Sequence, residues 1–148
     1  FYPLQTFSKS REVNFKEIPL CIEADNKAFN LTLTKLANQI SDSVWQIDSI
    51  QRKQLHLSAV FACNFVNHMY VLAKGLLGQE EIDFEILHPL IKETAIKATC
   101  MEPKLAQTGP ALRNDTESLE KHLELLSSYP EIQKIYRIIS KSIWLFNK

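Results

Sequence analysis

The chain has 148 residues, the size of one ordinary domain, and 45% of them are hydrophobic, which is too apolar for a disordered chain. Its 17 basic and 17 acidic residues balance, so it lacks the positive footprint of a nucleic-acid-binding protein, and that class is set aside. No uninterrupted apolar run reaches the ~18 residues that a membrane span needs. The first eleven residues lack the basic start and apolar core of a signal peptide. We therefore expect a cytoplasmic protein with no membrane partner.

Three short strands are predicted in the first third of the chain, at residues 1–7, 19–24 and 43–48. A helix is predicted from about Lys27 to Ile40, because its apolar residues recur at helical spacing and Asp25 or Asn26 can cap it. A strand-strand-helix-strand unit buries little apolar surface and leaves part of its sheet open. We expect residues 1–48 to extend a sheet whose other strands lie earlier in a longer parent chain.

The pattern becomes helical from Ser49 onward. A long helix from about Ile50 to Leu77 would span roughly 40 Å. It is apolar around most of its circumference, so we expect it to be the central, buried helix, with Gly78 as its stop.

Three further helical segments are predicted after the long helix. The first covers residues 83–100, where Pro89 either starts the helix or kinks it. Asp115 can cap the second, and Ser128 with Glu131 has the spacing of a capping box for the last.

The three cysteines, Cys21, Cys63 and Cys100, lie far apart in apolar surroundings. They fit neither the ligand spacing of a zinc site nor a disulfide framework. We expect three reduced, buried thiols and no metal site, as is usual in a cytosolic protein.

Five polar residues share one arc of the long helix. With Asn64 at zero on a wheel of about 100° per residue, His68 lies at about +40°, Asn67 at about −60°, and His56 and Lys74 at about −80°. A solvated helix face usually carries Glu, Lys and Arg, whereas asparagine and histidine are more typical of a polar cleft. The alternative is a set of buried hydrogen bonds between helices.

A loop with the sequence AQTGPALRND, residues 106–115, contains one of only three glycines in the chain. Gly109 and Pro110 favour a rigid turn, around which Gln107, Thr108 and Arg113 can donate and accept hydrogen bonds. The plainer interpretation is a helix connector with an N-cap. The chain contains no glycine-rich phosphate loop and no Gly-x-Ser-x-Gly motif.

Five segments together resemble a known bacterial family: PLQTFS (3–8), IPLCIEA (18–24), QRKQLHLSAVFACNFVNHMY (51–70), PLIKET (89–94) and AQTGPALRND (106–115). That family joins a Rossmann-like domain to a helical domain of unknown function, and it is labelled as NADP oxidoreductases of the deazaflavin-dependent type. The resemblance implies a mostly α fold, with a helical domain similar to the C-terminal domain of 6-phosphogluconate dehydrogenase behind a small α/β remnant of the Rossmann-like domain. Residues 1–48 would be the remnant, and residues 49–148 the helical substrate and dimerisation domain.

The resemblance also implies site residues in a cleft between the two domains. The catalytic candidates are His56, Asn64 and His68. The substrate-binding candidates are Asn67, Gln107, Thr108 and Arg113. Gln5 and Thr6 would border the cofactor, NADP, which the absent N-terminal domain would mainly hold.

Two departures from related enzymes limit this transfer of roles. The family often has a histidine directly before the Pro-Leu-Gln-Thr-Phe run, where this chain has Tyr2. Val60 occupies the position four residues before Asn64, where hydroxyacid dehydrogenases place a catalytic lysine. Their mechanism is therefore not assumed.

Two functions are compatible with the sequence. The first is the C-terminal part of an NAD(P)-dependent oxidoreductase that acts as a homodimer on a small molecule, with the fragment alone inactive. The second is a non-enzymatic dimerisation or nucleotide-sensing module, for which the isoleucine-rich last helix, with Trp144 and Phe146 near its end, would suit a partner surface.

Overall fold

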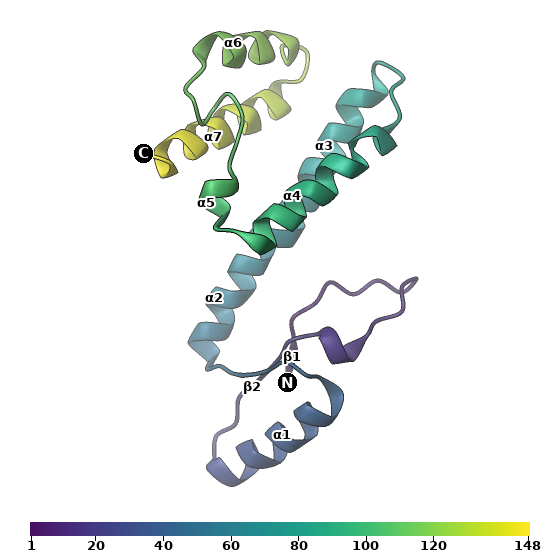
Figure 1. Ribbon diagram of the computed structural model, residues 1–148, viewed down its shortest axis with the longest axis vertical. Coiled ribbons are helices and arrows are strands. Elements are labelled where there is room, and N and C mark those ends of the chain that lie inside the picture. Colours follow the sequence, from purple (N-terminus) through teal and green to yellow (C-terminus); the bar gives the residue numbers. More distant parts are fainter. The chain divides into compact units, whose positions relative to one another are not determined.

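The computed structural model describes all residues, Phe1–Lys148, and forms two compact units, Phe1–Tyr70 and Val71–Lys148. The division between them falls inside one continuous helix, Ser49–Gly78. The chain is mostly helical, with a small α/β unit at its start (Figure 1), as the resemblance implied. The domain boundary expected after residue 48 lies at the start of the long helix and stays a prediction.

The N-terminal unit is built on a sheet of three short strands in the order β1-β2-β3. They are β1 (Tyr2–Pro3), β2 (Leu20–Ile22) and β3 (Val44–Gln46). β1 runs antiparallel to β2 with Tyr2 opposite Cys21, and β3 runs parallel to β2 with Leu20 opposite Val44. All three predicted strands are present but shorter than expected. The helix α1 (Lys27–Ile40) connects β2 to β3, and its bounds are those the sequence predicted.

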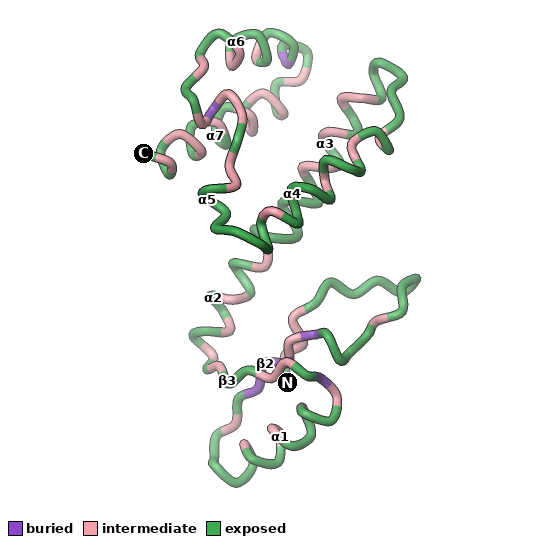
Figure 2. The backbone as a smooth tube through the Cα atoms, in the orientation of Figure 1, coloured by how far each residue is buried: buried purple, intermediate pink, exposed green.

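The core of this unit lies between β2 and α1. Leu20 and Ile22 pack against Ala37, and Leu33 and Ile40 of α1 border them. All three residues of β2 are buried, and Figure 2 shows buried segments here, whereas Ala111 and Leu126 are buried in the C-terminal unit.

A buried serine closes the core at the end of α1. The Ser41 hydroxyl donates to the Ile18 carbonyl and accepts from the Ser43 N–H at 3.0 Å, so this buried polar group is satisfied.

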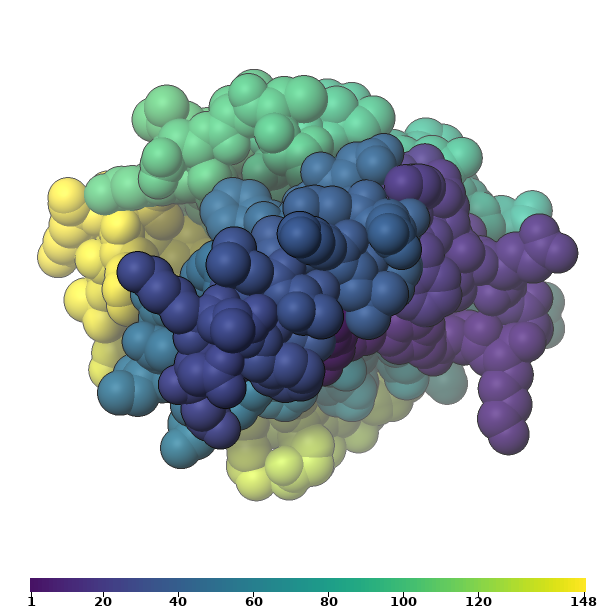
Figure 3. Space-filling model, turned by 90° about the horizontal axis from the view of Figure 1, so that it is seen from below, coloured from purple at the N-terminus to yellow at the C-terminus, as the bar shows by residue number.

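The outer side of the N-terminal unit remains open. In the space-filling view of Figure 3, α1 stands out as a blue ridge beside the purple N-terminal segment. Phe29 of α1 is 55% exposed, and Trp45 of the edge strand β3 is 59% exposed. The open sheet edge that the sequence predicted is therefore present.

The long helix consists of α2 (Ser49–Ala59), a π-helical segment η2 (Val60–Phe65) and α3 (Val66–Gly78). Asp48 caps it with a complete capping box, in which Gln51 reaches back to the Asp48 N–H at 2.9 Å. The predicted length is confirmed, but none of its residues is buried within its own unit, so the expected burial of this helix is not found inside either unit. A helix with so many apolar residues is expected to be covered by a surface from outside the unit that holds it.

By length and composition, Ser49–Gly78 is also the one helix that could cross a membrane, a test that core helices of globular proteins pass as well. The polar residues within the helix did not prevent it from meeting that criterion.

The C-terminal unit contains a 3₁₀ segment and four helices: η3 (Phe84–Leu87), α4 (His88–Cys100), α5 (Pro103–Ala106), α6 (Thr116–Leu125) and α7 (Pro130–Phe146). Pro89 lies in the first turn of α4 and so starts that helix, where its missing N–H costs nothing. The short helix α5 was not predicted, and it lies between two of the predicted helical segments. α6 and α7 are tied together by the Gln133 side-chain amide, which donates to the Leu123 carbonyl at 2.8 Å.

The capping box predicted for the last helix does not form. Tyr129 is the N-cap of α7, and no side chain caps the helix. Pro130 is the reason, because it is accommodated in the first turn and this places Ser128 outside the helix.

The cysteines also depart from expectation. All three are free, but only Cys21 is buried, and burial raises the pKa of its thiol. Cys63 and Cys100 are exposed.

Candidate functional site

A tyrosine-histidine pair lies where β1 meets the first turns of the long helix. The Tyr2 phenolic oxygen is 3.1 Å from Nδ1 of His56, and the two rings pack edge to face with centroids 6.5 Å apart. Pairing of Tyr2 with Cys21 places the tyrosine at this end of the sheet. The residue that replaces the family's histidine thus contacts the first histidine predicted to be catalytic.

Two basic residues join this pair around a shallow pocket of about 300 Å³, which Tyr2, Arg52, Lys53 and His56 line. Arg52 and Lys53 precede His56 by four and three residues, so the helix places all three near one another. The Lys53 side chain makes no hydrogen bond or ion pair in the structure. Neither basic residue was predicted from the sequence, although their helical spacing from His56 was a usable signal.

Arg52 is held by a small ionic network at the start of α2. Its guanidinium lies 3.2 Å from a Glu23 carboxylate oxygen and donates to the Ser49 hydroxyl at 3.1 Å. Glu23 also accepts from the Ser49 N–H at 2.8 Å and from its hydroxyl. The network anchors the long helix to the end of β2 and fixes the position of the arginine.

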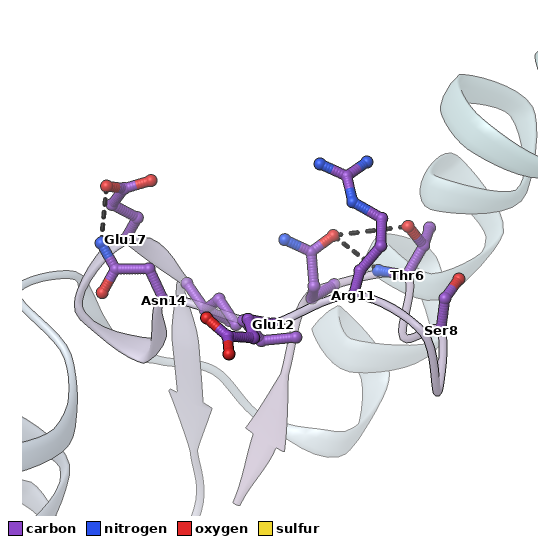
Figure 4. A pocket seen from close by; sticks show the side chains of 9 residues that line it. Thr6, Ser8, Arg11, Glu12, Asn14 and Glu17 are labelled. Carbon is purple, nitrogen blue, oxygen red and sulfur yellow. Dashed lines mark hydrogen bonds between the residues drawn. The ribbon is translucent and has the colours of Figure 1, made fainter.

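A second, polar pocket of about 320 Å³ lies in the first segment of the chain, lined by Gln5, Thr6, Ser8, Arg11, Glu12, Val13, Asn14, Glu17 and Ile18. In Figure 4, Thr6, Ser8 and Arg11 lie at one end, and Asn14 and Glu17 lie at the other, joined by a hydrogen bond of 2.6 Å. The Gln5 side-chain oxygen accepts from the Thr6 N–H at 2.7 Å. The structure therefore brings the two predicted cofactor residues together.

The Arg11 end of this pocket offers hydrogen-bond donors from the Arg11 guanidinium and from the Thr6 and Ser8 hydroxyls. Arg11 has no ion pair. The chain has no glycine-rich turn to cradle a pyrophosphate, so these residues could contact the cofactor but not hold it alone. Ser8 and Arg11 were missed by the sequence analysis, because the loop that brings them to Gln5 has no recognisable motif.

The polar residues farther along the long helix form a separate group. Asn64, Asn67 and His68 are exposed and make no side-chain hydrogen bond. An i→i+5 turn holds about one residue more than an α turn, so the whole π-helical segment between them shifts His56 by about 100° relative to His68. His56 and His68 then share a side of the helix but lie roughly 18 Å apart along it, too far to reach one reacting atom.

The loop of residues 106–115 belongs to the C-terminal unit. Gly109 has a φ of 103° and Asn114 a φ of 52°, so two left-handed residues shape it. The Gln107 side-chain amide donates to the Thr108 carbonyl at 2.8 Å, and the Arg113 guanidinium lies 4.0 Å from Asp115. Thr108 and Arg113 are exposed. This side of the loop is available for binding, while Asp115 is occupied as the N-cap of α6.

The C-terminal unit contains a second histidine-tyrosine pair that the sequence analysis missed. Nδ1 of His122 on α6 is 2.7 Å from the phenolic oxygen of Tyr136 on α7. The pair borders a mainly apolar pocket of about 410 Å³. The two residues are 14 positions apart on different helices, so no local pattern indicates the contact. Nowhere in the chain do three or more His, Cys, Asp or Glu residues cluster to hold a metal ion.

Comparisons with known proteins give the chain a family. The family model described as "Domain of unknown function (DUF2520)" matches residues 18–143. A crystal structure of a "putative NADP oxidoreductase" from Bacteroides fragilis is 51% identical over 97% of this chain, with a TM-score of 0.92. A protein from Thermotoga maritima, 24% identical over 99% of this chain, shares the fold with a TM-score of 0.80. No curated protein sequence matches.

The chain spans 56% of the Bacteroides chain and 60% of the Thermotoga chain. The family model nevertheless covers well over half of this chain, and the Bacteroides relative aligns along nearly all of it. The chain therefore belongs to the DUF2520 family.

Proposed function

We propose that this chain is part of an NADP-dependent oxidoreductase that acts on a small molecule. Support comes from the Bacteroides relative, whose name is that of an NADP oxidoreductase and which is 51% identical to this chain. The observation that carries the proposal is the hydrogen bond between Tyr2 and His56, because it provides a proton-exchanging pair at the edge of an open pocket.

The cofactor would be bound mainly by residues outside this chain, which lacks a pyrophosphate-binding turn. The reduced form, NADPH, would supply the hydride when bound. Gln5 and Thr6 would contact its polar edge, with the Gln5 amide oriented by the Thr6 N–H. NADP is preferred over a deazaflavin because of the name of the relative.

His56 would serve as the acid or base of the reaction, since an imidazole exchanges protons readily near neutral pH. Its hydrogen bond to Tyr2 holds the ring in one orientation. If His68 is the acid or base instead of His56, Asn64 would orient the substrate by hydrogen bonding and Asn67 would bind it beside them.

On the loop, Gln107 and Thr108 would hydrogen-bond the substrate, and the exposed Arg113 guanidinium would bind an anionic group.

The test is NADPH-dependent reduction by the natural protein that carries this chain, across small carbonyl compounds, imines and acids. His56→Ala, or His68→Ala if His68 is the acid or base instead, should lose turnover by a factor of about 100 or more, the usual contribution of a positioned acid or base. His88→Ala, which changes an exposed histidine outside the candidate site, is the control. Unchanged turnover in both His56→Ala and His68→Ala would remove the proposed roles of the histidines.

A second function, dimerisation, is favoured by one observation. Ile50, Leu57, Phe61 and Phe65 of the long helix are each about half exposed or more. We propose that a second copy of this chain covers them, so that the protein is a homodimer. We also propose that this homodimer is cytoplasmic. If the natural protein binds NADP but reduces nothing, the chain is a dimerisation or nucleotide-sensing module.

A further inference from the structure

We propose that the pocket formed by Tyr2, Arg52, Lys53 and His56 binds a carboxylate of the substrate through Lys53, and that Tyr2 gives the substrate its proton. This rests on the proposed oxidoreductase function and deepens it. It names the substrate class, a small carbonyl compound that bears a carboxylate. It also assigns roles to two residues that the sequence analysis did not place in the site.

The charges around the pocket favour an anion. Arg52 is paired with Glu23 at 3.2 Å, so the two largely cancel. Lys53 has no acidic neighbour within ion-pair distance. One positive charge is therefore left without a partner in a pocket that contains no carboxylate. A carboxylate would form a charge-assisted hydrogen bond there.

The size of the pocket limits what can enter. Its volume of about 300 Å³ is at the lower end of the range for ligand sites. Arg52 keeps further N–H donors beyond those that contact Glu23 and Ser49, so it can orient a second oxygen of the ligand. A small substrate with a carboxylate and a neighbouring carbonyl fits these limits.

Tyr2 is suited to donate a proton to the substrate, because His56 can then return a proton to the Tyr2 oxygen. The Tyr2 O–H bond breaks as its proton passes to the carbonyl oxygen of the substrate. The reduced nicotinamide cofactor, when bound, would supply the hydride that the carbonyl carbon takes up. A proton on Nδ1 of the imidazolium form of His56 then passes to the phenolate oxygen, 3.1 Å away. The neutral ring regains a proton from water, since His56 is exposed. The net change is one hydride and one proton added to the carbonyl.

The binding step is tested first, on the chain alone and without cofactor. Sodium acetate is titrated at constant ionic strength while the His56 ring signals are followed by ¹⁵N NMR. Lys53→Met should weaken acetate binding about tenfold, and Lys35→Met, which changes an exposed lysine on α1, should leave it unchanged. An unmodified chain that does not bind acetate, or equal binding by both variants, overturns the carboxylate site.

The proton step is tested in the natural protein with NADPH. Tyr2→Phe keeps the ring contact with His56 but removes the hydroxyl, so kcat should fall about 100-fold or more while KM changes little. Lys53→Met should mainly raise KM for substrates that bear a carboxylate. Tyr70→Phe is the control, because the Tyr70 hydroxyl makes no hydrogen bond.

The outcomes separate this proposal from the proposed function. Full turnover in Tyr2→Phe overturns the proton role even if the protein is a reductase. If the natural protein reduces no substrate at all, the oxidoreductase function and the proton step fail together, and the acetate titration still decides the binding site. In Tyr2→Phe, a changed His56 ring signal would show that the hydrogen bond existed, and an unchanged one would overturn the pairing.

Discussion

At the scale of single residues, Asp115 shows how a cap makes stability depend on pH. The Ser118 hydroxyl donates to its carboxylate at 2.7 Å and the Ser118 N–H donates at 3.1 Å, and these bonds lower the pKa of Asp115. Nearby Arg113 and Lys121 contribute less. A carboxylate whose pKa is lower in the folded state stabilises the fold above its unfolded pKa of about 3.9, and this is lost as pH falls through the folded value.

Asp115→Asn keeps a capping residue but removes the charge. We expect the variant to be less stable than the unmodified chain at pH 7, and the difference to shrink as pH falls below about 4. Urea unfolding between pH 3 and 7 measures this. Asp25→Asn, at an exposed aspartate whose carboxylate accepts no hydrogen bond, should show no such trend. A difference that does not vary with pH would contradict the assignment.

Replacing each of two glycines by alanine should change the stability of the fold in opposite directions. Gly109 has a φ of 103°, and a Cβ added there meets no atom within 4 Å, so the cost is backbone strain of about 1–2 kcal/mol. Gly75 lies inside α3, also with open space around a Cβ, so alanine should stabilise the fold by about 0.5–1 kcal/mol. Thermal unfolding of Gly109→Ala and Gly75→Ala checks both, and a shift in the same direction in both variants would contradict this account.

At the scale of elements, helix starts depend on which residue can occupy the first turn. Asp48 caps α2 with a complete capping box, whereas Ser128 lies outside α7 because Pro130 lies in its first turn. Asp48→Ala should cost about 1 kcal/mol of unfolding free energy and Ser128→Ala close to zero. Urea unfolding of the two variants measures the contrast. A cost for Ser128→Ala equal to that for Asp48→Ala would mean that a capping box forms after all.

The elements that the sequence predicted well carry local signals. Asn26 accepts from the Phe29 N–H at 2.8 Å, and this cap together with the apolar spacing predicted the bounds of α1 correctly. The π-helical segment Val60–Phe65 carries no such signal, since its residues continue the helical pattern on both sides. The uniform wheel therefore misplaced His56 relative to His68.

The candidate site was predicted only in part, because local sequence signals do not show contacts between distant residues. His56 stood out as a polar residue on an apolar helix, and Gln5 and Thr6 through the family resemblance. The contact between Tyr2 and His56 spans 54 positions and depends on the pairing of β1 with β2, which short-range patterns do not encode. The predicted roles of Asn64, Asn67, His68, Gln107, Thr108 and Arg113 stay predictions.

At the scale of the whole molecule, the long helix is the element whose apolar side chains stay exposed. Composition alone predicted that this helix would be buried, because its own apolar residues occupy most of its circumference. Composition does not say which surface covers a helix, and neither unit by itself buries its part of this one. Phe61 and Phe65 pack edge to face with ring centroids 4.9 Å apart, yet they are 62% and 49% exposed. A stable association between two copies usually removes about 800 Å² from each partner, which needs more than scattered apolar side chains.

If a second copy covers this face, the chain should sediment at twice its mass of 17.1 kDa, and Phe61→Glu should give a monomer because it buries a charge in the interface. Phe29→Glu places the same charge on α1, where Phe29 is 55% exposed, and should stay dimeric. Cys63 lies in the same helix, so a thiol reagent should modify Cys100 in the dimer and both exposed cysteines in Phe61→Glu. An unmodified chain that is monomeric at micromolar concentration, or that partitions into lipid vesicles through this helix, would contradict the dimer.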